Sequence, residues 1–218
     1  FLWMCQGYYR HSEGYTPQWP GMDRFSGQIV HPQTWPEGLD LAGKRVEISR
    51  EVLPRLRRIA ILANAGYPAA MQEMARAEAA ARMLGIKIVK LEVRQGKDIA
   101  PAIAGFKDGE MLYVCSDALI GTNIVEINNL ALTARLPTMH GSIQAVKAGG
   151  LMAYAPNVAA MFKRAAELVD KILKGAKPAD LPVEQPTVFE LVINMKTAKA
   201  LGLKIPQSVL LQANELIK

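Results

Sequence analysis

Short apolar runs and amphipathic stretches alternate through residues 58–140, and this alternation limits the possible folds more than any other feature. The apolar runs lie at 58–63, 86–93, 111–115 and 137–140, and each has the length of a buried strand. The stretches between them have the spacing of amphipathic helices. Because strands that alternate with helices form parallel sheets, the sequence predicts an α/β fold with a doubly wound parallel sheet.

Proline and glycine mark the ends of the first helix. Pro68 suits the first turn of a helix, and Gly85 suits the position just after its last turn. Further helices are predicted at about 98–106 and 123–135, where apolar residues recur on one stripe.

The chain after residue 148 departs from this alternation. Strands are predicted at 149–154 and 187–193, with a long helix at 157–174 between them. A short helix at 195–201 and a terminal helix over 206–217 complete the predicted elements.

The helix predicted at 157–174 carries a wide apolar stripe. Its members are Val158, Met161, Phe162, Ala165, Leu168, Val169, Ile172 and Leu173. An apolar stripe of this width is unfavourable in water and normally finds a partner. Three partners are possible for this stripe: the aromatic N-terminal segment, the residues after Thr187, or a second copy of the chain. We favour self-association through the 157–174 helix, because the N-terminal segment has no matching apolar face.

A change of composition divides the chain near residues 46–50. Residues 1–46 hold eight of the fourteen aromatic residues and carry four basic and four acidic side chains. The remainder therefore carries the whole formal charge of +6. The change predicts a poorly structured N-terminal part at 1–48 and an α/β part at 49–218.

Several classes of function are disfavoured by composition and motifs. The chain has 218 residues, of which 50% are hydrophobic and 21% charged, so disorder is not expected. Its basic residues are scattered without interleaved aromatics, which disfavours nucleic-acid binding. Two cysteines and three scattered histidines give no metal-ligand spacing, and neither glycine-rich phosphate-binding motif occurs. No cofactor, metal, membrane span or signal peptide is therefore predicted.

Polar side chains follow the predicted strands at the sheet edge where parallel folds bind ligands. The candidate ligand-binding residues are Asn64, Ser116, Asp117, Gly141, Ser142 and Tyr154. Together they suit a small polar or zwitterionic molecule, with Asp117 placed to bind an amine. The alternative for Asn64 and Asp117 is that they only cap helices and turns. A third interpretation is a flavodoxin-like hydrolase in which Cys115, His140 and Asp117 converge.

Residues 49–218 contain several long motifs in a consistent order. They include Glu51–Ala60, Gly149–Tyr154, Ile172–Pro186, Phe189–Asn194 and Lys196–Gly202. This part resembles the carboxyl-terminal half of ABC-transporter substrate-binding proteins of the type I periplasmic-binding-protein-like class, whose members bind tryptophan and tyrosine. The resemblance implies one of two lobes that close on a ligand, an ABC permease as partner, and a periplasmic or extracytoplasmic location.

Residues 1–46 resemble a different family. Phe25, Gly27, His31 and the Trp35-Pro36 pair match the F-x-G-x-x-x-H-x-x-x-W-P fingerprint of Baeyer–Villiger-type flavin monooxygenases. That family binds FAD and NADPH through glycine-rich turns, which this sequence does not contain. We therefore expect a chimeric or incomplete chain that is not an enzyme and binds an amino-acid-like molecule for an ABC importer. The alternative is a fragment of an FAD- and NADPH-dependent flavin monooxygenase.

Overall fold

The computed structural model describes residues 40–106, 110–182, 184 and 186–218. These residues fall into two compact units. The sheet unit comprises residues 40–156 and 189–218, and the helical unit comprises the described residues of 157–188. The poorly structured segment predicted at 1–48 lies outside the described residues as far as residue 39.

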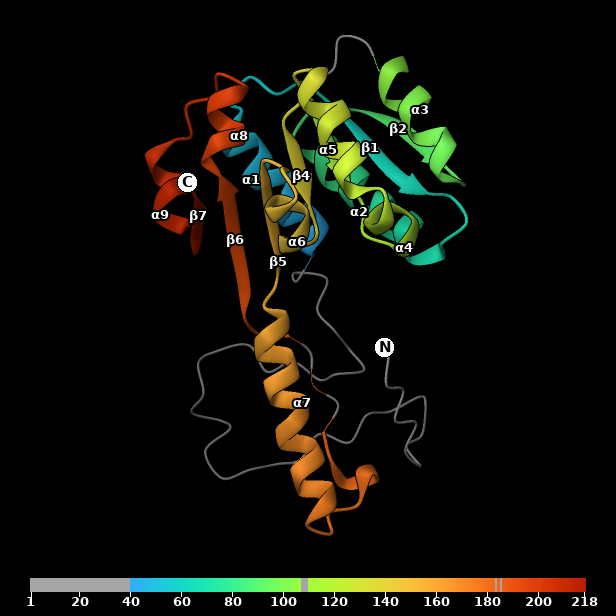
Figure 1. Cartoon of the computed structure of the whole chain (residues 1–218), viewed down its shortest axis with the longest axis vertical. Helices are drawn as coiled ribbons and strands as arrows, with labels where there is room; N and C mark the ends of the chain where they lie inside the picture. Colours follow the sequence, from blue (N-terminus) through green and yellow to red (C-terminus); the bar gives the residue numbers. More distant parts are fainter. Residues whose placement is uncertain (1–39, 107–109, 183, 185) are drawn as a thin grey trace. The chain divides into compact units, whose positions relative to one another are not determined.

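A seven-stranded sheet runs through the sheet unit in the order β2-β1-β3-β4-β5-β6-β7 (Figure 1). The strands are β1 (Arg58–Asn64), β2 (Lys87–Val93), β3 (Met111–Val114), β4 (Thr138–His140), β5 (Met152–Pro156), β6 (Phe189–Asn194) and β7 (Glu215–Ile217). Neighbouring strands are parallel except β5 and β6, which are antiparallel. The predicted α/β fold is confirmed, with one antiparallel pair that the sequence pattern did not reveal.

Helices lie on both faces of this sheet (Figure 1). They are α1 (Leu41–Val52), α2 (Pro68–Met83), α3 (Ile99–Gly105), α4 (Ala118–Thr122), α5 (Ile124–Thr133), α6 (Ile143–Lys147), α8 (Met195–Ala200) and α9 (Gln207–Gln212). The 3-10 turn η2 (Gly96–Asp98) leads into α3. The short helices α4 and α6 were not predicted from the sequence.

The apolar run of β1 supplies two cores because successive side chains point to opposite faces of the sheet. Ile59 and Ile61 are fully buried in the core that contains α1 and α2. Ala60 and Leu62 are fully buried in the core that contains α3 and α5. Burial on both faces explains why β1 reads as a continuous apolar run.

Helix α1 was not predicted, and it begins before the expected boundary. Oδ1 of Asp40 accepts a hydrogen bond from the Ala42 amide at 3.1 Å and caps the first turn. Val46 and Ile48 are buried in the same core as β1. The helix therefore runs without interruption through residues 46–50, where the composition changes.

The terminal helix predicted over 206–217 is wrong in its second half, since α9 ends at Gln212 and β7 follows. The backbone of Asn214 donates to the Leu191 carbonyl at 2.8 Å. Its side-chain Oδ1 accepts from the Leu191 amide at 2.9 Å. These two bonds fix an extended chain beside β6.

The helical unit contains α7 (Val158–Leu173), which confirms the helix predicted at 157–174, and the 3-10 turn η3 (Pro178–Asp180). The Asn157 side chain accepts from the Ala160 amide at 2.7 Å and caps α7. None of the residues of α7 is buried. A backbone hydrogen bond joins the two ends of the unit, because the Val188 carbonyl accepts from the Asn157 amide at 2.9 Å.

Candidate ligand-binding site

A cleft of about 440 Å³ lies at the carboxyl ends of β3 and β4 in the sheet unit. Its lining residues are Val114, Cys115, Ser116, Asp117, Ala118, Ile120, Gly121, Ile124, His140, Ser142, Gln144 and Ala145. The two strands are parallel neighbours, so their carboxyl ends open at the same edge. The walls are mostly apolar, with a few polar groups at defined places, as in small-molecule sites generally.

Asp117 is the charged residue of this lining. It caps α4, and its Oδ1 accepts a hydrogen bond from the Ile120 amide at 3.0 Å. Its other oxygen, Oδ2, is buried and has no hydrogen-bond partner among the described residues. Because a buried carboxylate oxygen without a partner is costly, Oδ2 is an acceptor suited to a donor on a ligand.

Two serines add polar groups to the cleft. Ser142 precedes α6, and its side chain makes no capping hydrogen bond to that helix. Ser116 is exposed, and its backbone N–H donates to Oε2 of Glu73 at 3.3 Å. The structure therefore brings three predicted site residues, Ser116, Asp117 and Ser142, into one cleft.

The other predicted site residues are not among the lining residues of this cleft. Asn64 ends β1, where its Oδ1 accepts from the Gly66 amide at 2.8 Å and closes a turn. The Tyr154 ring stacks on Phe189, with ring centroids 5.9 Å apart. Gly141 directly follows β4 and lies close to Ser116, since a Cβ added there would be 2.6 Å from the Ser116 hydroxyl oxygen.

A buried polar network that sequence reasoning missed lies beside these residues. The Arg45 guanidinium donates from Nη1 to Oε1 of Glu73 at 2.7 Å and to the Tyr113 hydroxyl at 3.0 Å. Burial opposes the charged form of Arg45, but Tyr113 and Glu73 hold its pKa above the ordinary value. The one signal in the sequence was Tyr113, a side chain with a polar tip inside the apolar run of β3.

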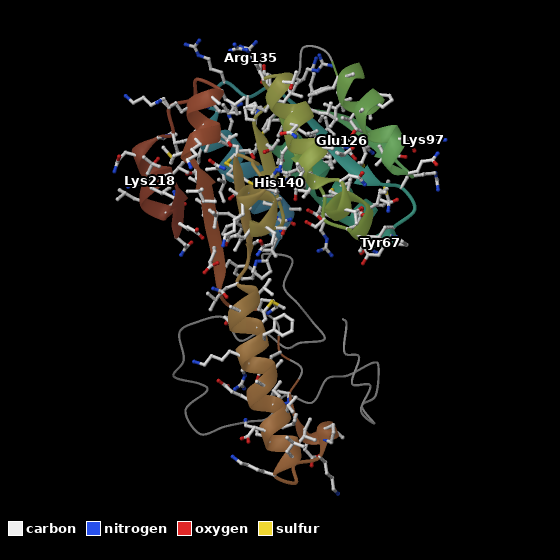
Figure 2. All side chains as sticks on the ribbon, viewed as in Figure 1. Tyr67, Lys97, Glu126, Arg135, His140 and Lys218 are labelled. Atoms are coloured by element: carbon white, nitrogen blue, oxygen red, sulfur yellow. The ribbon has the colours of Figure 1, made fainter. Side chains whose placement is uncertain are left out.

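Two titratable side chains of the lining are uncharged at neutral pH. Burial, with a smaller contribution from Arg45, lowers the pKa of His140 to about 3. Figure 2 shows His140 inside the sheet unit. Burial and then Glu73 raise the pKa of the Cys115 thiol. Since the thiolate is the nucleophilic form, this environment disfavours a hydrolase built on Cys115.

Within the described residues, no group of three or more His, Cys, Asp or Glu side chains is arranged to hold a metal ion. In the same part of the chain, no helix has both the length and the apolar character needed to cross a membrane.

The sequence profile of a family described as ABC transporter substrate binding protein matches residues 38–217. This chain belongs to that family. The match starts ahead of the boundary expected at 46–50 and includes all of α1. It confirms the resemblance seen in residues 49–218.

Solved structures agree with this assignment. A conserved domain protein from Vibrio cholerae superposes with a TM-score of 0.74 at 26% identity, covering 80% of this chain and 60% of that one. An ABC domain from Streptococcus pneumonia, in complex with L-Trp, superposes with a TM-score of 0.73 at 25% identity. That match covers 81% of this chain and 62% of the other. The chain therefore has the type I periplasmic-binding-protein-like fold and spans about three fifths of these two relatives.

A short stretch is similar to flavin monooxygenases. The FAD-containing monooxygenase EthA from Mycolicibacterium smegmatis is 47% identical over 66 residues, which cover 30% of this chain and 13% of that protein. A second relative, MymA from Mycobacterium tuberculosis, is 52% identical over 48 residues, covering 22% of this chain and 10% of that protein. The similar stretch therefore corresponds to only a small part of the length of these two proteins.

Proposed function

We propose that this chain is the small-molecule-binding component of an ABC importer and binds an amino-acid-like ligand through its amine. The observation that supports this most is the buried, unpartnered Oδ2 of Asp117 in the cleft. An ammonium group donates three hydrogen bonds and carries the complementary charge. Ile120 and Ile124 in the same lining suit an apolar side chain of the ligand.

The similarities support the same class of ligand and a role in transport. The Streptococcus pneumonia relative is described with L-Trp bound. Members of the family are typically extracytoplasmic, so we propose a periplasmic or extracytoplasmic site of action and an ABC permease as partner. The protonated Cys115 thiol and the neutral His140 favour binding without chemical conversion.

The ligand should be held weakly by this chain alone. Solved relatives are longer, and this chain covers 60% and 62% of the two described above. A cleft with one wall buries much less of a ligand than a site closed from both sides, and affinity falls accordingly. We propose that the residues of the cleft form one of the two walls between which the complete ligand site closes.

The test of this function is Asp117→Asn, which keeps the capping oxygen and removes the charge. We expect L-tryptophan to bind to the variant about tenfold or more weakly in isothermal titration calorimetry, because hydrogen bonds to charged groups contribute about 1.5–3 kcal/mol. The matched control is Asp40→Asn, since Asp40 caps α1 in the same way and does not line the cleft. Equal affinities of both variants, across a panel of amino acids, would contradict the proposal.

A second candidate is a fragment of an FAD- and NADPH-dependent monooxygenase, favoured by the identity with EthA and MymA. The sequence has no glycine-rich dinucleotide turn. Saturable binding of FAD at micromolar concentration in equilibrium dialysis would support this candidate over the first.

We also propose that the chain self-associates through α7. Exposed apolar side chains gather on this helix: Val158, Met161, Phe162, Val169, Ile172 and Leu173. A second copy offers the same stripe, so two such helices can cover each other's apolar residues in an isologous contact.

A further inference from the structure

Arg45 is a buried cation that connects four elements of the sheet unit. It lies on α1 and is 6% exposed. Nε donates to the Tyr154 carbonyl of β5 at 2.8 Å, and Nη1 donates to Glu73 on α2 and to Tyr113 on β3. The Tyr113 hydroxyl in turn donates to Oε1 of Glu73 at 2.8 Å. We call Arg45, Glu73 and Tyr113 the Arg45 network.

The Arg45 network contacts the backbone next to the cleft as well as its own members. Oε2 of Glu73 accepts from the Ser116 amide, one residue before Asp117. Gly141, one residue before Ser142, packs closely against the guanidinium, since a Cβ at this position would be 3.0 Å from Arg45 Nη2. Through these contacts the network touches the carboxyl ends of β3 and β4, and through the Tyr154 carbonyl it touches the middle of β5.

Stability alone is a weak explanation for such a network. The side chains of Arg45 and Glu73 are 7% and 18% exposed, so both charges have lost most of their water. A desolvated ion pair often contributes no more to folding than apolar residues of the same volume. Its directional hydrogen bonds, in contrast, fix the relative positions of the groups that it joins.

We propose that Arg45 is a positioning residue for the ligand site, because its planar guanidinium holds the strand ends that carry Ser116, Asp117 and Ser142 at the spacing that a ligand needs. This inference rests on the proposed function, since it takes the cleft to be the ligand site. Arg45 acts through Glu73, Tyr113 and the backbone, and it is not itself one of the cleft's lining residues.

The experiment compares Arg45→Lys with Arg50→Lys in the full chain. Lysine keeps the charge but loses the planar set of donors. Arg50 is a matched control on the same helix, because its Nη1 donates to the Leu56 carbonyl, ahead of the amino end of β1. Three properties are measured: affinity for L-tryptophan, exchange of backbone amide hydrogens by NMR, and thermal unfolding.

We expect Arg45→Lys to weaken L-tryptophan binding about tenfold and to speed exchange of the Ser116 amide about tenfold. Arg50→Lys should change neither, even where the two variants lose thermal stability equally. Should Arg45→Lys fail to fold, Tyr113→Phe replaces it, since this change removes one hydroxyl and leaves the Arg45–Glu73 pair. A threefold loss of affinity is expected for that variant.

Gly141→Ala tests the same positioning from β4. The added Cβ would meet the Ser116 hydroxyl and the guanidinium at distances that force one of them to move. We expect an affinity loss of about tenfold with all three members of the network still present. An unchanged affinity in Gly141→Ala would count against the inference.

The readouts separate this inference from the proposed function. Two results would overturn the positioning role alone. One is an unchanged Ser116 exchange rate in Arg45→Lys. The other is that Arg45→Lys and Arg50→Lys bind L-tryptophan equally well while Asp117→Asn binds it more weakly. An unchanged affinity in Asp117→Asn, together with faster Ser116 exchange in Arg45→Lys, overturns the proposed ligand site and supports the role of Arg45 in holding the strand ends.

Discussion

Helices α2 and α7 both have sixteen residues, but only α2 has residues that are buried. On α2, Ala70, Met74, Ala77 and Ala81 are buried. On α7, no residue is buried, and Phe162 is 73% exposed. The helix with the more distinct apolar stripe is therefore the one without a cover in its unit.

The contrast shows that an apolar stripe indicates a need for burial but does not identify the element or partner that buries it. The buried face of α2 consists mainly of alanines, which let α1 approach closely. A Cβ at Gly43 on α1 would be 3.5 Å from the Cβ of Ala80 on α2. The stripe of α7 consists of large side chains, which suit a partner that brings its own apolar surface.

The largest difference between the two helices should appear in stability. Met74→Ala on α2 leaves a cavity in the sheet unit, because Met74 is 1% exposed. We expect a loss of about 2–5 kcal/mol in the free energy of unfolding. Phe162→Ala on α7 should change it by less than about 0.5 kcal/mol at concentrations where the chain is monomeric. Urea unfolding followed by circular dichroism measures both, and equal losses would show that α7 is covered after all.

Acid should destabilise the sheet unit through His140. His140 is neutral in the folded sheet unit because its pKa is about 3, whereas an exposed histidine titrates near 6.5. Between these values the unfolded chain binds the extra proton, so stability falls as pH falls, by up to about 1.4 kcal/mol per pH unit. His140→Gln should remove this part of the slope between pH 6.5 and 3.

The measurement is urea unfolding at a series of pH values, with the slope of His140→Gln subtracted from that of the parent chain. Other acidic groups contribute to both chains, and the subtraction leaves the contribution of His140. Identical slopes would mean that folding does not lower the pKa of His140.

The effect on association should be specific to α7. Phe162→Asp places a charge on the proposed contact and should weaken the self-association constant about tenfold or more in sedimentation equilibrium. Val125→Asp is the matched control, because Val125 is 58% exposed on α5 of the sheet unit. A parent chain that sediments as a monomer would contradict the proposed self-association directly.

The sequence predicted elements well where one strong local signal was present. β1 and β3 are apolar runs buried on both faces, and α2 begins at Pro68, as predicted. Gly85 follows α2 with φ of +68°, a conformation that glycine adopts without strain. Helix α1 was not predicted because its burial depends on the sheet against which it packs, and because the composition changes within the helix, near residue 46.

The lining of the cleft was predictable in part, for a similar reason. The rule that ligands bind at strand ends selected Ser116, Asp117 and Ser142, and these three residues line one cleft. It also selected Asn64 and Tyr154, whose side chains are used by a turn and by a ring contact within the protein. The Arg45 network was not predictable, because Arg45, Glu73 and Tyr113 are separated by 28 and 40 positions and meet only in the folded chain.

The helical unit leaves and re-enters the sheet unit between two paired positions. Pro156 at the end of β5 and Phe189 at the start of β6 are cross-strand partners in the antiparallel pair. Antiparallel strands can be joined by a turn of two residues. Residues 157–188 are thus an insertion in a β-hairpin, and the register of the two strands is set by their own pairing. We expect a chain in which Asn-Gly replaces this insertion to keep the fold of the sheet unit, because that pair favours a two-residue hairpin turn.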